Sequence, residues 1–398
     1  MAAALPDGGF PNCNSPNLVL RQPTTGECVT IWNNTSAAWI DSLTTPLYLE
    51  ESLFLTTVPL AKNGGMTTWV LVHRDQLPDQ RRVLCSCESF LKHSLTSDTS
   101  GKVSHNIVHG IASVFCPVPY RRRGYARRMM QELVKELYKW QTDGQPSVGS
   151  TLYSDIGKEY YTKLGWASNI TNTQIELQPS AGPWPSSAKA ILESDVESLC
   201  KRDEAIIESR MAVPTTELET RFTIIPDLDH MGWHFGKEDF ATDHLFKKRP
   251  SAKGVMVGTP GNQMWATWVH RYYGRHDDET PHNVLYILRL VVEADETATR
   301  LPSDASKRPA QDVYEEQVRL LKAVLQAAQA EAAEWQLDVV KLWDSSPLVL
   351  DLLAQSELEY TATDRQEDSI ASLLWYDRDG GISETPPFWV NNEHYAWQ

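Results

Sequence analysis

The chain has 398 residues, of which 41% are hydrophobic and 22% charged, and its formal net charge is −15. These values fit a folded protein of two domains. The acidic balance argues against nucleic acid or an anionic membrane as a partner, because both need a basic face, and it is compatible with a small cationic substrate. No apolar run reaches the ~18 residues of a bilayer span. The N-terminal segment lacks a basic stretch and an apolar core, so we expect a cytoplasmic protein without a signal peptide.

The six cysteines do not have the spacing of a metal site. Cys85 and Cys87 form a CxC in "RRVLCSCESF", but no second Cys or His pair accompanies them. One pair cannot complete a tetrahedral zinc site. We therefore expect no metal, reduced thiols, and core packing of these two side chains on one face of a strand.

The N-terminal half alternates strand and helix patterns. The segments "GMTTWVLVHR", "RRVLCSCESFLKH" and "SHNIVHGIASVFCPV" are rich in β-branched and apolar residues and predict three strands. Apolar residues at three- and four-residue steps predict a helix over 124–140. A short strand in "STLYSDIG" and a short helix in "KEYYTKLGW" follow.

The segment 178–188, "QPSAGPWPSSA", is rich in Pro, Ser and Gly and predicts a domain boundary. We expect domains over 1–180 and 191–398 with a linker at 181–190. A helix is predicted in "SDVESLCKRDEAIIESRM", with Ser194 or Asp195 as its N-cap. The second half then repeats the order strand, strand, long helix, strand, short helix. This order favours a second copy of the first fold over an unrelated α/β domain.

Three consecutive arginines in an acidic chain need a local explanation. Arg121, Arg122 and Arg123 precede Gly124 where a strand passes through a turn into the long helix. Free backbone N–H groups and the positive end of the helix dipole make such a turn a site for phosphate oxygens, and a glycine lets the backbone approach them. The alternative is a surface basic cluster. The pattern is neither a P-loop nor a dinucleotide-binding fingerprint.

This turn carries a resemblance to a known family. "RRRGYA" resembles the R/Q-x-x-G-x-G/A signature of the GNAT superfamily of acetyltransferases. "EYYTKLGW" is similar to the family's Tyr-x-x-x-Gly-aromatic segment, with Tyr161, Gly165 and Trp166 in place. Over about 65–170 the chain resembles the fungal lysine acetyltransferases. The implied fold is α/β (α+β): a GNAT-type mixed sheet flanked by helices, followed by a second, GNAT-like domain.

The resemblance also implies a donor and its site. The donor would be acetyl-CoA, with backbone groups of Val114, Phe115 and Cys116 along its pantetheine arm and acetyl carbonyl. Tyr161 would sit near the thioester sulfur as the proton donor, with Tyr160 as a competitor. The residues implied to hold the pyrophosphate are Arg121, Arg122, Arg123, Gly124, Tyr125 and Ala126.

Glu88 is the candidate for the general base or the amine anchor. It is a carboxylate inside an apolar strand, "CSCESF", where charged groups are rare. Alternation with Cys85 and Cys87 could instead place it on a solvated face. His105 and His109 flank the cofactor strand and could relay a proton or have structural roles.

The C-terminal half is expected to serve the acceptor side. The segment 293–311, which would correspond to the phosphate loop, has no glycine and many acids, so we predict no second acetyl-CoA site. A domain interface makes a pocket. Glu293, Asp344 and the tail "PFWVNNEHYAW" are candidates to line it, with plain packing as the alternative.

The predicted function is acetyl transfer from acetyl-CoA to the side-chain amine of free L-lysine by direct attack. The alternatives are a polyamine, another amino acid or a specialised-metabolite amine as acceptor, a protein-lysine acetyltransferase, and a non-catalytic acyl-CoA-binding regulator. An open groove would favour a peptide acceptor, and a covered pocket a small one. The intact "RRRGYA" and Tyr161 argue against the regulator.

Overall fold

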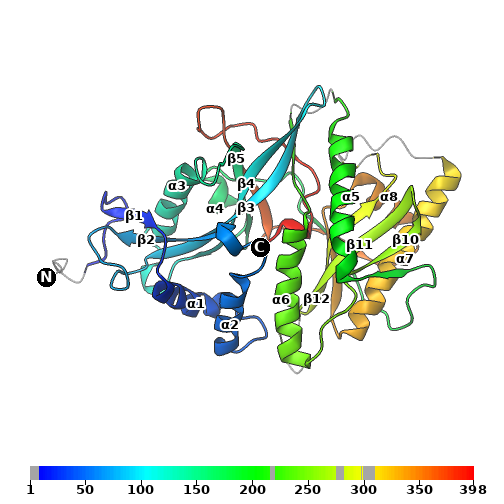
Figure 1. Ribbon diagram of the computed structural model, residues 1–398, viewed down its shortest axis with the longest axis horizontal. Coiled ribbons are helices and arrows are strands. Elements are labelled where there is room, and N and C mark those ends of the chain that lie inside the picture. Colours follow the sequence, from blue (N-terminus) through cyan, green and yellow to red (C-terminus); the bar gives the residue numbers. More distant parts are fainter. Residues whose placement is uncertain (1–8, 216–219, 275–281, 297, 299–309) are drawn as a thin grey trace.

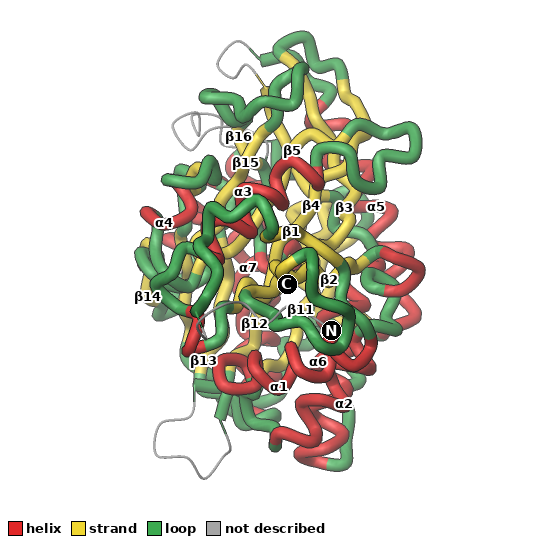
Figure 2. Tube along the Cα trace, turned by 90° about the vertical axis from the view of Figure 1, so that its left-hand side faces the viewer, coloured by secondary structure: helices red, strands yellow, loops and turns green. Residues whose placement is uncertain are grey.

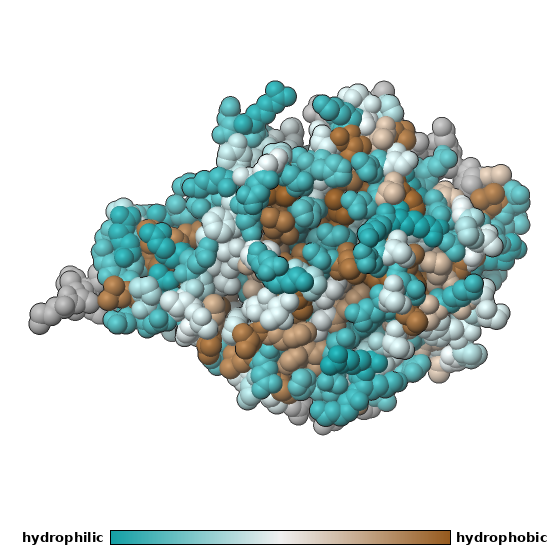
Figure 3. All heavy atoms as spheres, in the orientation of Figure 1, coloured by the Kyte–Doolittle hydropathy of each residue, from teal (hydrophilic) through white to brown (hydrophobic). Residues whose placement is uncertain are grey.

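The computed structural model describes residues 9–215, 220–274, 282–296, 298 and 310–398. Two mixed β-sheets lie side by side and helices cover them (Figure 1). Hydrophilic residues spread over most of the face shown in Figure 3, in keeping with the acidic composition. Among the described residues no helix is both long and apolar enough to cross a bilayer.

The first sheet has the strand order β1-β2-β3-β4-β5-β15-β6, and β9 pairs with β3 and with β16. All neighbours are antiparallel except β4–β5 and β9–β16. The strands are β1 (Leu18–Arg21), β2 (Met66–His73), β3 (Cys85–Asp98), β4 (Val103–Phe115), β5 (Ser147–Ser154), β6 (Ala167–Ser168), β9 (Thr220–Ile224), β15 (Ile370–Trp375) and β16 (Phe388–Trp389).

The second sheet has the order β14-β7-β13-β12-β11-β10-β8, with β12–β13 as its parallel pair. Its strands are β7 (Thr173–Leu177), β8 (Lys189–Ile191), β10 (Gly254–Thr259), β11 (Asn262–Arg271), β12 (Val284–Val292), β13 (Val339–Trp343) and β14 (Thr361–Asp364).

Eight α-helices occur in the described residues. They are α1 (Thr25–Trp39), α2 (Thr45–Leu55), α3 (Tyr125–Leu137), α4 (Glu159–Thr162), α5 (Glu193–Met211), α6 (Leu228–Phe246), α7 (Gln311–Glu334) and α8 (Pro347–Gln355). The predicted strands and the long helix of the N-terminal half are present, but α3 ends earlier than predicted. The N-cap prediction for α5 was wrong. Leu192 is the N-cap, and Asp195 lies in the first turn, where its carboxylate accepts from the Leu192 N–H at 2.9 Å.

The predicted repetition of the fold is confirmed. In the first sheet α3 connects the parallel strands β4 and β5, and in the second α7 connects β12 and β13. A short helix follows each unit, α4 after β5 and α8 after β13. The predicted absence of a phosphate loop in the second copy concerns 293–311, most of which lies outside the described residues.

The two sheets exchange strands. β7 precedes the predicted linker yet pairs with β13 in the second sheet, whereas β15, near the end of the chain, pairs with β5 in the first. Figure 1 shows β15's orange segment reaching the sheet that holds β4 and β5. The domain limits stay a prediction. The exchange means that moving one sheet away from the other would break backbone hydrogen bonds in both.

The three largest apolar cores in the described residues hold these layers together. One packs α3 on the first sheet and contains Cys85 and Cys87, so their predicted core packing is confirmed. A second packs α7 and α8 on the second sheet. The third lies between the sheets and includes Phe222, Trp265 and Tyr395. Figure 2 shows the C-terminal residues in the middle of the molecule, beside strands of both sheets.

Candidate active site

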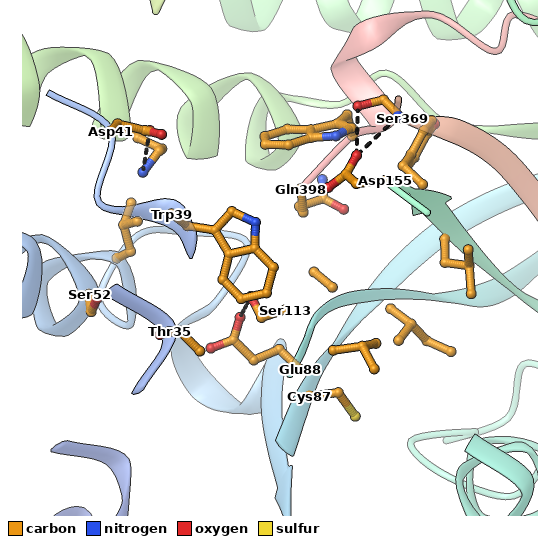
Figure 4. A pocket seen from close by; sticks show the side chains of 18 of the residues that line it. Thr35, Trp39, Asp41, Ser52, Cys87, Glu88, Ser113, Asp155, Ser369 and Gln398 are labelled. Carbon is orange, nitrogen blue, oxygen red and sulfur yellow. Dashed lines mark hydrogen bonds and ion pairs between the residues drawn. The ribbon is translucent and has the colours of Figure 1, made fainter. Parts of the chain in front are cut away.

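A cavity of about 520 Å³ opens where the two halves of the chain meet (Figure 4). Strands β3, β4 and β5 form one wall, α1 and α2 a second, and α6, β11 and the C-terminal segment a third. Both halves therefore contribute side chains to one chamber. In the described ranges no group of three or more His, Cys, Asp or Glu side chains could hold a metal ion.

The first wall is a place where two parallel strands separate. β4 and β5 pair as far as Ile111 opposite Leu152, and the pairing stops there although β4 continues to Phe115. A parallel pair that ends early leaves one edge of each strand without its neighbour. The edge of β4 beyond Ile111, which includes Val114, can therefore offer backbone groups to an extended ligand.

A bulge in β4 sits at the same place. Opposite β3, Glu88 pairs with Ala112 and Ser86 with Phe115, so Ser113 and Val114 together face Cys87. The bulge is accommodated at Ser113, whose backbone is left-handed with a φ of 54°. Such bulges redirect side chains and are common beside active sites. Here the bulge brings Ser113 alongside Glu88 (Figure 4).

The arginine–glycine turn has the geometry of an anion site. Gly124 is the N-cap of α3 with a φ of 83°, and Arg122 is also left-handed with a φ of 63°. Left-handed residues interspersed in a turn direct successive N–H groups into one concavity. Within the described residues no hydrogen bond satisfies the backbone N–H groups from Arg122 to Arg127, and the first that does is donated by Arg128 to the Gly124 carbonyl at 3.0 Å.

The side chains around this turn differ in their exposure. Arg121, Arg122 and Arg123 are exposed, as a phosphate site requires. Arg123 stacks on Phe10, with its guanidinium carbon 3.9 Å from the ring centroid. Tyr125 is buried, and its hydroxyl donates to a backbone carbonyl, so only its main chain is available to a ligand.

Tyr161 lines the cavity from α4, and its neighbour Tyr160 does not. Burial raises the pKa of Tyr161 above its usual value, so the phenol carries its proton at neutral pH. No hydrogen bond from its hydroxyl occurs in the described part of the chain, which leaves that proton available to a ligand. Gly165 and Trp166 follow. Trp166 is fully buried and its Nε1–H donates to Ser150 Oγ on β5 at 3.1 Å, which ties the segment after Tyr161 to the sheet.

Glu88 faces the cavity and not bulk solvent. Ser113 Oγ donates to Glu88 Oε2 at 2.8 Å. Burial raises the pKa of Glu88, and the Ser113 hydrogen bond and the charge of Lys237 partly offset that rise. A carboxylate with a raised pKa is a stronger proton acceptor than an exposed one, as a general base needs to be.

The cavity also holds acidic groups that the sequence did not single out. Asp155 follows β5, and its Oδ1 accepts from the Ser369 N–H at 3.0 Å (Figure 4). Asp155 is exposed to solvent, yet desolvation by the surrounding protein raises its pKa, while that hydrogen bond opposes the shift. The one signal in the sequence was its position directly after β5, the strand that pairs with β4.

A group of four charges forms another part of the lining. Asp41, Glu51, Lys237 and Arg271, which we call the charge cluster, come from the α1–α2 segment, α2, α6 and β11. No motif surrounds any of the four: Asp41 lies in the connection between α1 and α2, and the other three lie within helices or a strand. Because the four are far apart along the chain, only the tertiary structure brings them together.

Several residues considered from the sequence lie elsewhere. His105 pairs with Glu208, and His109 is buried against Ser147, with a pKa that burial lowers to about 4. Glu293 pairs with Arg202, and Asp344 contacts Asn392 and Thr173; neither lines this cavity. Of the predicted aromatic tail, Trp397 does line it.

Comparison with known proteins agrees with this architecture. Residues 173–398 match the family profile described as the LYC1 GNAT-like C-terminal domain, which covers more than half of the chain. The chain belongs to this family of GNAT N-acetyltransferases. The match begins at β7, the strand that joins the second sheet ahead of the predicted linker.

Relatives of this GNAT acetyltransferase span both halves. A protein of Yarrowia lipolytica named lysine acetyltransferase is 23% identical over an alignment of 308 positions that covers 67% of this chain and 74% of the relative. N-myristoyltransferase of Saccharomyces cerevisiae, solved with bound myristoyl-CoA, aligns with a TM-score of 0.51 at 9% identity and covers 93% of this chain and 82% of its own. A GCN5-related N-acetyltransferase from Anabaena variabilis aligns with a TM-score of 0.48 at 13% identity and covers 90% and 72%. The myristoyltransferase shares the fold of two adjacent sheets.

Proposed function

We propose that this acetyltransferase moves the acetyl group of acetyl-CoA to the side-chain amine of free L-lysine. The observation that carries the proposal is a single cavity in which the separated strands β4 and β5, Tyr161 and Glu88 meet. The relative named lysine acetyltransferase supports lysine as the acceptor. The acidic lining, with Asp155 and Glu88, favours a cationic amine over a neutral one.

In this proposal the donor lies along the opening between β4 and β5. Its pyrophosphate is held by N–H groups of the turn over Arg121, Arg122, Arg123, Gly124, Tyr125 and Ala126. The pantetheine arm pairs with backbone groups of Val114, Phe115 and Cys116. The bound myristoyl-CoA in the yeast enzyme of the same fold supports a CoA thioester as donor.

The acceptor must lose a proton before it can attack. A lysine side chain has a reference pKa near 10.4, so neutralising it at pH 7 costs about 4.6 kcal/mol unless the site shifts that pKa. Glu88, directly or through water, takes this proton. Its raised pKa and its hydrogen bond with Ser113 suit that role.

The neutral amine attacks the thioester carbonyl carbon and forms a tetrahedral oxyanion. A backbone N–H on the free edge of β4 stabilises this oxyanion. The C–S bond then breaks, and the CoA thiolate takes the phenolic proton of Tyr161. The attacking nitrogen is cationic in the tetrahedral intermediate, and it loses a second proton to solvent as the amide forms. The products are the amide, CoA and one released proton, and the proton that Glu88 took returns to Tyr161 through solvent, so protons balance over the cycle.

Tyr161→Phe should lower turnover by about 100-fold, the lower end of what a positioned general acid contributes, because the departing thiolate loses its proton donor. The affinity for acetyl-CoA should stay near that of the wild type. Tyr160→Phe is the matched control, since this neighbouring phenol does not line the cavity. Steady-state kinetics and calorimetry would check both. Wild-type turnover in Tyr161→Phe would remove this residue from the mechanism.

The cavity walls bear on the competing acceptors. Helices α1, α2 and α6 and the C-terminal segment surround the cavity, which favours a small acceptor over a peptide in a groove. Polyamines, other amino acids and specialised-metabolite amines fit the same acidic lining.

Mass spectrometry of the protein with acetyl-CoA and free L-lysine tests the proposal. The expected product carries one acetyl group on the side-chain nitrogen. Acetylation of spermidine with no reaction of lysine would replace the acceptor. Acetylation of a lysine peptide in preference to free lysine would favour the protein-modifying alternative, and uptake of acetyl-CoA without transfer to any amine would favour the regulator.

A further inference from the structure

We infer that the charge cluster binds the α-carboxylate and α-ammonium groups of a free amino acid acceptor, with Arg271 as the carboxylate ligand. The inference rests on the proposed function and adds the part of the acceptor that is recognised. It makes Arg271 a specificity-determining residue, separate from the groups that act on the reacting nitrogen.

The hydrogen bonding of Arg271 carries this inference. The residue is only 7% exposed, and its Nη2 donates to Asp41 Oδ2 at 2.9 Å. In the described part of the chain its guanidinium makes no other hydrogen bond, although Arg271 lines the cavity. Buried guanidinium groups normally have all their donors satisfied, because a buried N–H without an acceptor is costly even when the charge itself is paired. A planar anion in the cavity would satisfy the remaining N–H groups, and a carboxylate matches their fork geometry.

Aromatic rings keep this guanidinium in place. Its central carbon lies 5.1 Å from the ring centroid of Tyr273 and 5.5 Å from that of Trp397. Both rings also line the cavity. Arg271 therefore has little freedom to turn away, and a ligand carboxylate meets donors that are already oriented.

The rest of the cluster suits the ammonium group. Lys237 Nζ lies 2.7 Å from Glu51 Oε2 and 3.8 Å from Asp41 Oδ2. The two acids and two cations make the cluster neutral. An amino acid head group carries one charge of each sign, so the cluster with its ligand is neutral as well. Asp41 and Glu51 can accept from the α-ammonium while Arg271, with Lys237 nearby, binds the carboxylate.

The position of the cluster explains which amine of a diamino acid would react. Glu88 lies on β3 and Lys237 on α6, and both line the same cavity; the charge of Lys237 offsets part of the rise that burial causes in the pKa of Glu88. An acceptor held by its head group at the cluster directs its side chain toward Glu88 and the opening of β4. The α-amine is then occupied, and the side-chain amine reaches the thioester.

The experiment compares L-lysine with 1,5-diaminopentane, which has the same chain and terminal amines but no carboxylate. For the wild type we expect kcat/KM for lysine to exceed that for the diamine by on the order of 100-fold. Arg271→Gln should lower kcat/KM for lysine by about 30- to 100-fold, mainly through KM, and change the diamine value by less than about threefold. Arg202→Gln, which removes an arginine paired with Glu293 outside the cavity, is the matched control.

Two results would overturn the inference while leaving the proposed function intact. One is equal use of both acceptors by the wild type. The other is an equal loss for both acceptors in Arg271→Gln, which would make Arg271 a structural link to Asp41. Because that variant removes the closer of the two cations that contact Asp41 and leaves only Lys237 at 3.8 Å, Asp41→Asn/Arg271→Gln is assayed beside it, with thermal melting and acetyl-CoA affinity as checks of folding.

Calorimetry separates the two proposals if no amine is acetylated. L-Lysine is titrated into the wild type, Arg271→Gln and Asp41→Asn/Arg271→Gln in the presence of CoA. Binding that requires Arg271 would sustain the head-group site although the proposed reaction had failed. Absence of lysine binding, or equal binding in all three proteins, would exclude the head-group site.

Discussion

Glu88→Gln is expected to lower turnover by about 10²- to 10⁴-fold, the range that positioned general acids and bases contribute. The amide keeps the shape of the side chain and can still bond to Ser113, but it cannot take a proton from the acceptor amine. Acetyl-CoA affinity should not change, because the turn at Gly124 is untouched. Steady-state kinetics with lysine and calorimetry with acetyl-CoA separate the two effects.

The pH profile gives an independent check on the same residue. Glu88 acts as its carboxylate, and burial raises the pKa of this group above its ordinary value, so wild-type kcat should fall as pH drops through the raised pKa. Glu88→Gln should lack this acidic limb. An unchanged limb in the variant would assign the base to another group, with Asp155 next in line because desolvation also raises its pKa.

In Glu88→Gln the thermal stability should rise at neutral pH although the activity falls. The pKa of Glu88 is higher in the folded chain than in the unfolded one, so the native state binds more protons between the two values and loses stability as pH rises through that window. At neutral pH the amide should therefore raise the melting temperature, and below the unfolded pKa the difference should vanish. A lower melting temperature at neutral pH would contradict the assigned burial of Glu88.

Gly124→Val is expected to weaken acetyl-CoA binding by at least about 10-fold. Gly124 has a φ of 83°, where a β-branched residue is strained by about 1–2 kcal/mol or more. A Cβ there would also lie 2.8 Å from Cys13 Sγ, so the turn must shift. The shift moves the N–H groups that are proposed to hold the pyrophosphate. Calorimetry with acetyl-CoA measures the loss.

Gly144 provides a control with the same backbone strain. Its φ is 88°, and a Cβ there would meet nothing within 4 Å. Gly144→Val should lower the melting temperature yet leave acetyl-CoA affinity unchanged. If the two variants bind acetyl-CoA as tightly as the wild type, the phosphate site does not lie at the arginine–glycine turn.

Local chemistry explains which features could be read in advance. The β-branched runs predicted β2, β3 and β4, and the apolar spacing predicted α3, because each pattern matches the period of its own backbone. Gly124 and the arginines were recognisable because a phosphate turn needs residues adjacent in sequence. Glu88 was noticed as a charge in an apolar strand, but alternation alone could not say whether its face met solvent or a cavity.

By itself the sequence determined the order of strands and helices around α3 and around α7, the repeated fold and the family, since these depend on short-range patterns and motifs. The exchange of β7 and β15, the bulge at Ser113 and the charge cluster were decided only by the tertiary structure. Asp41 and Arg271 show the reason: they are in contact through an ion pair although 230 positions separate them. Which distant residues meet depends on how two sheets pack, and no local periodicity specifies that packing.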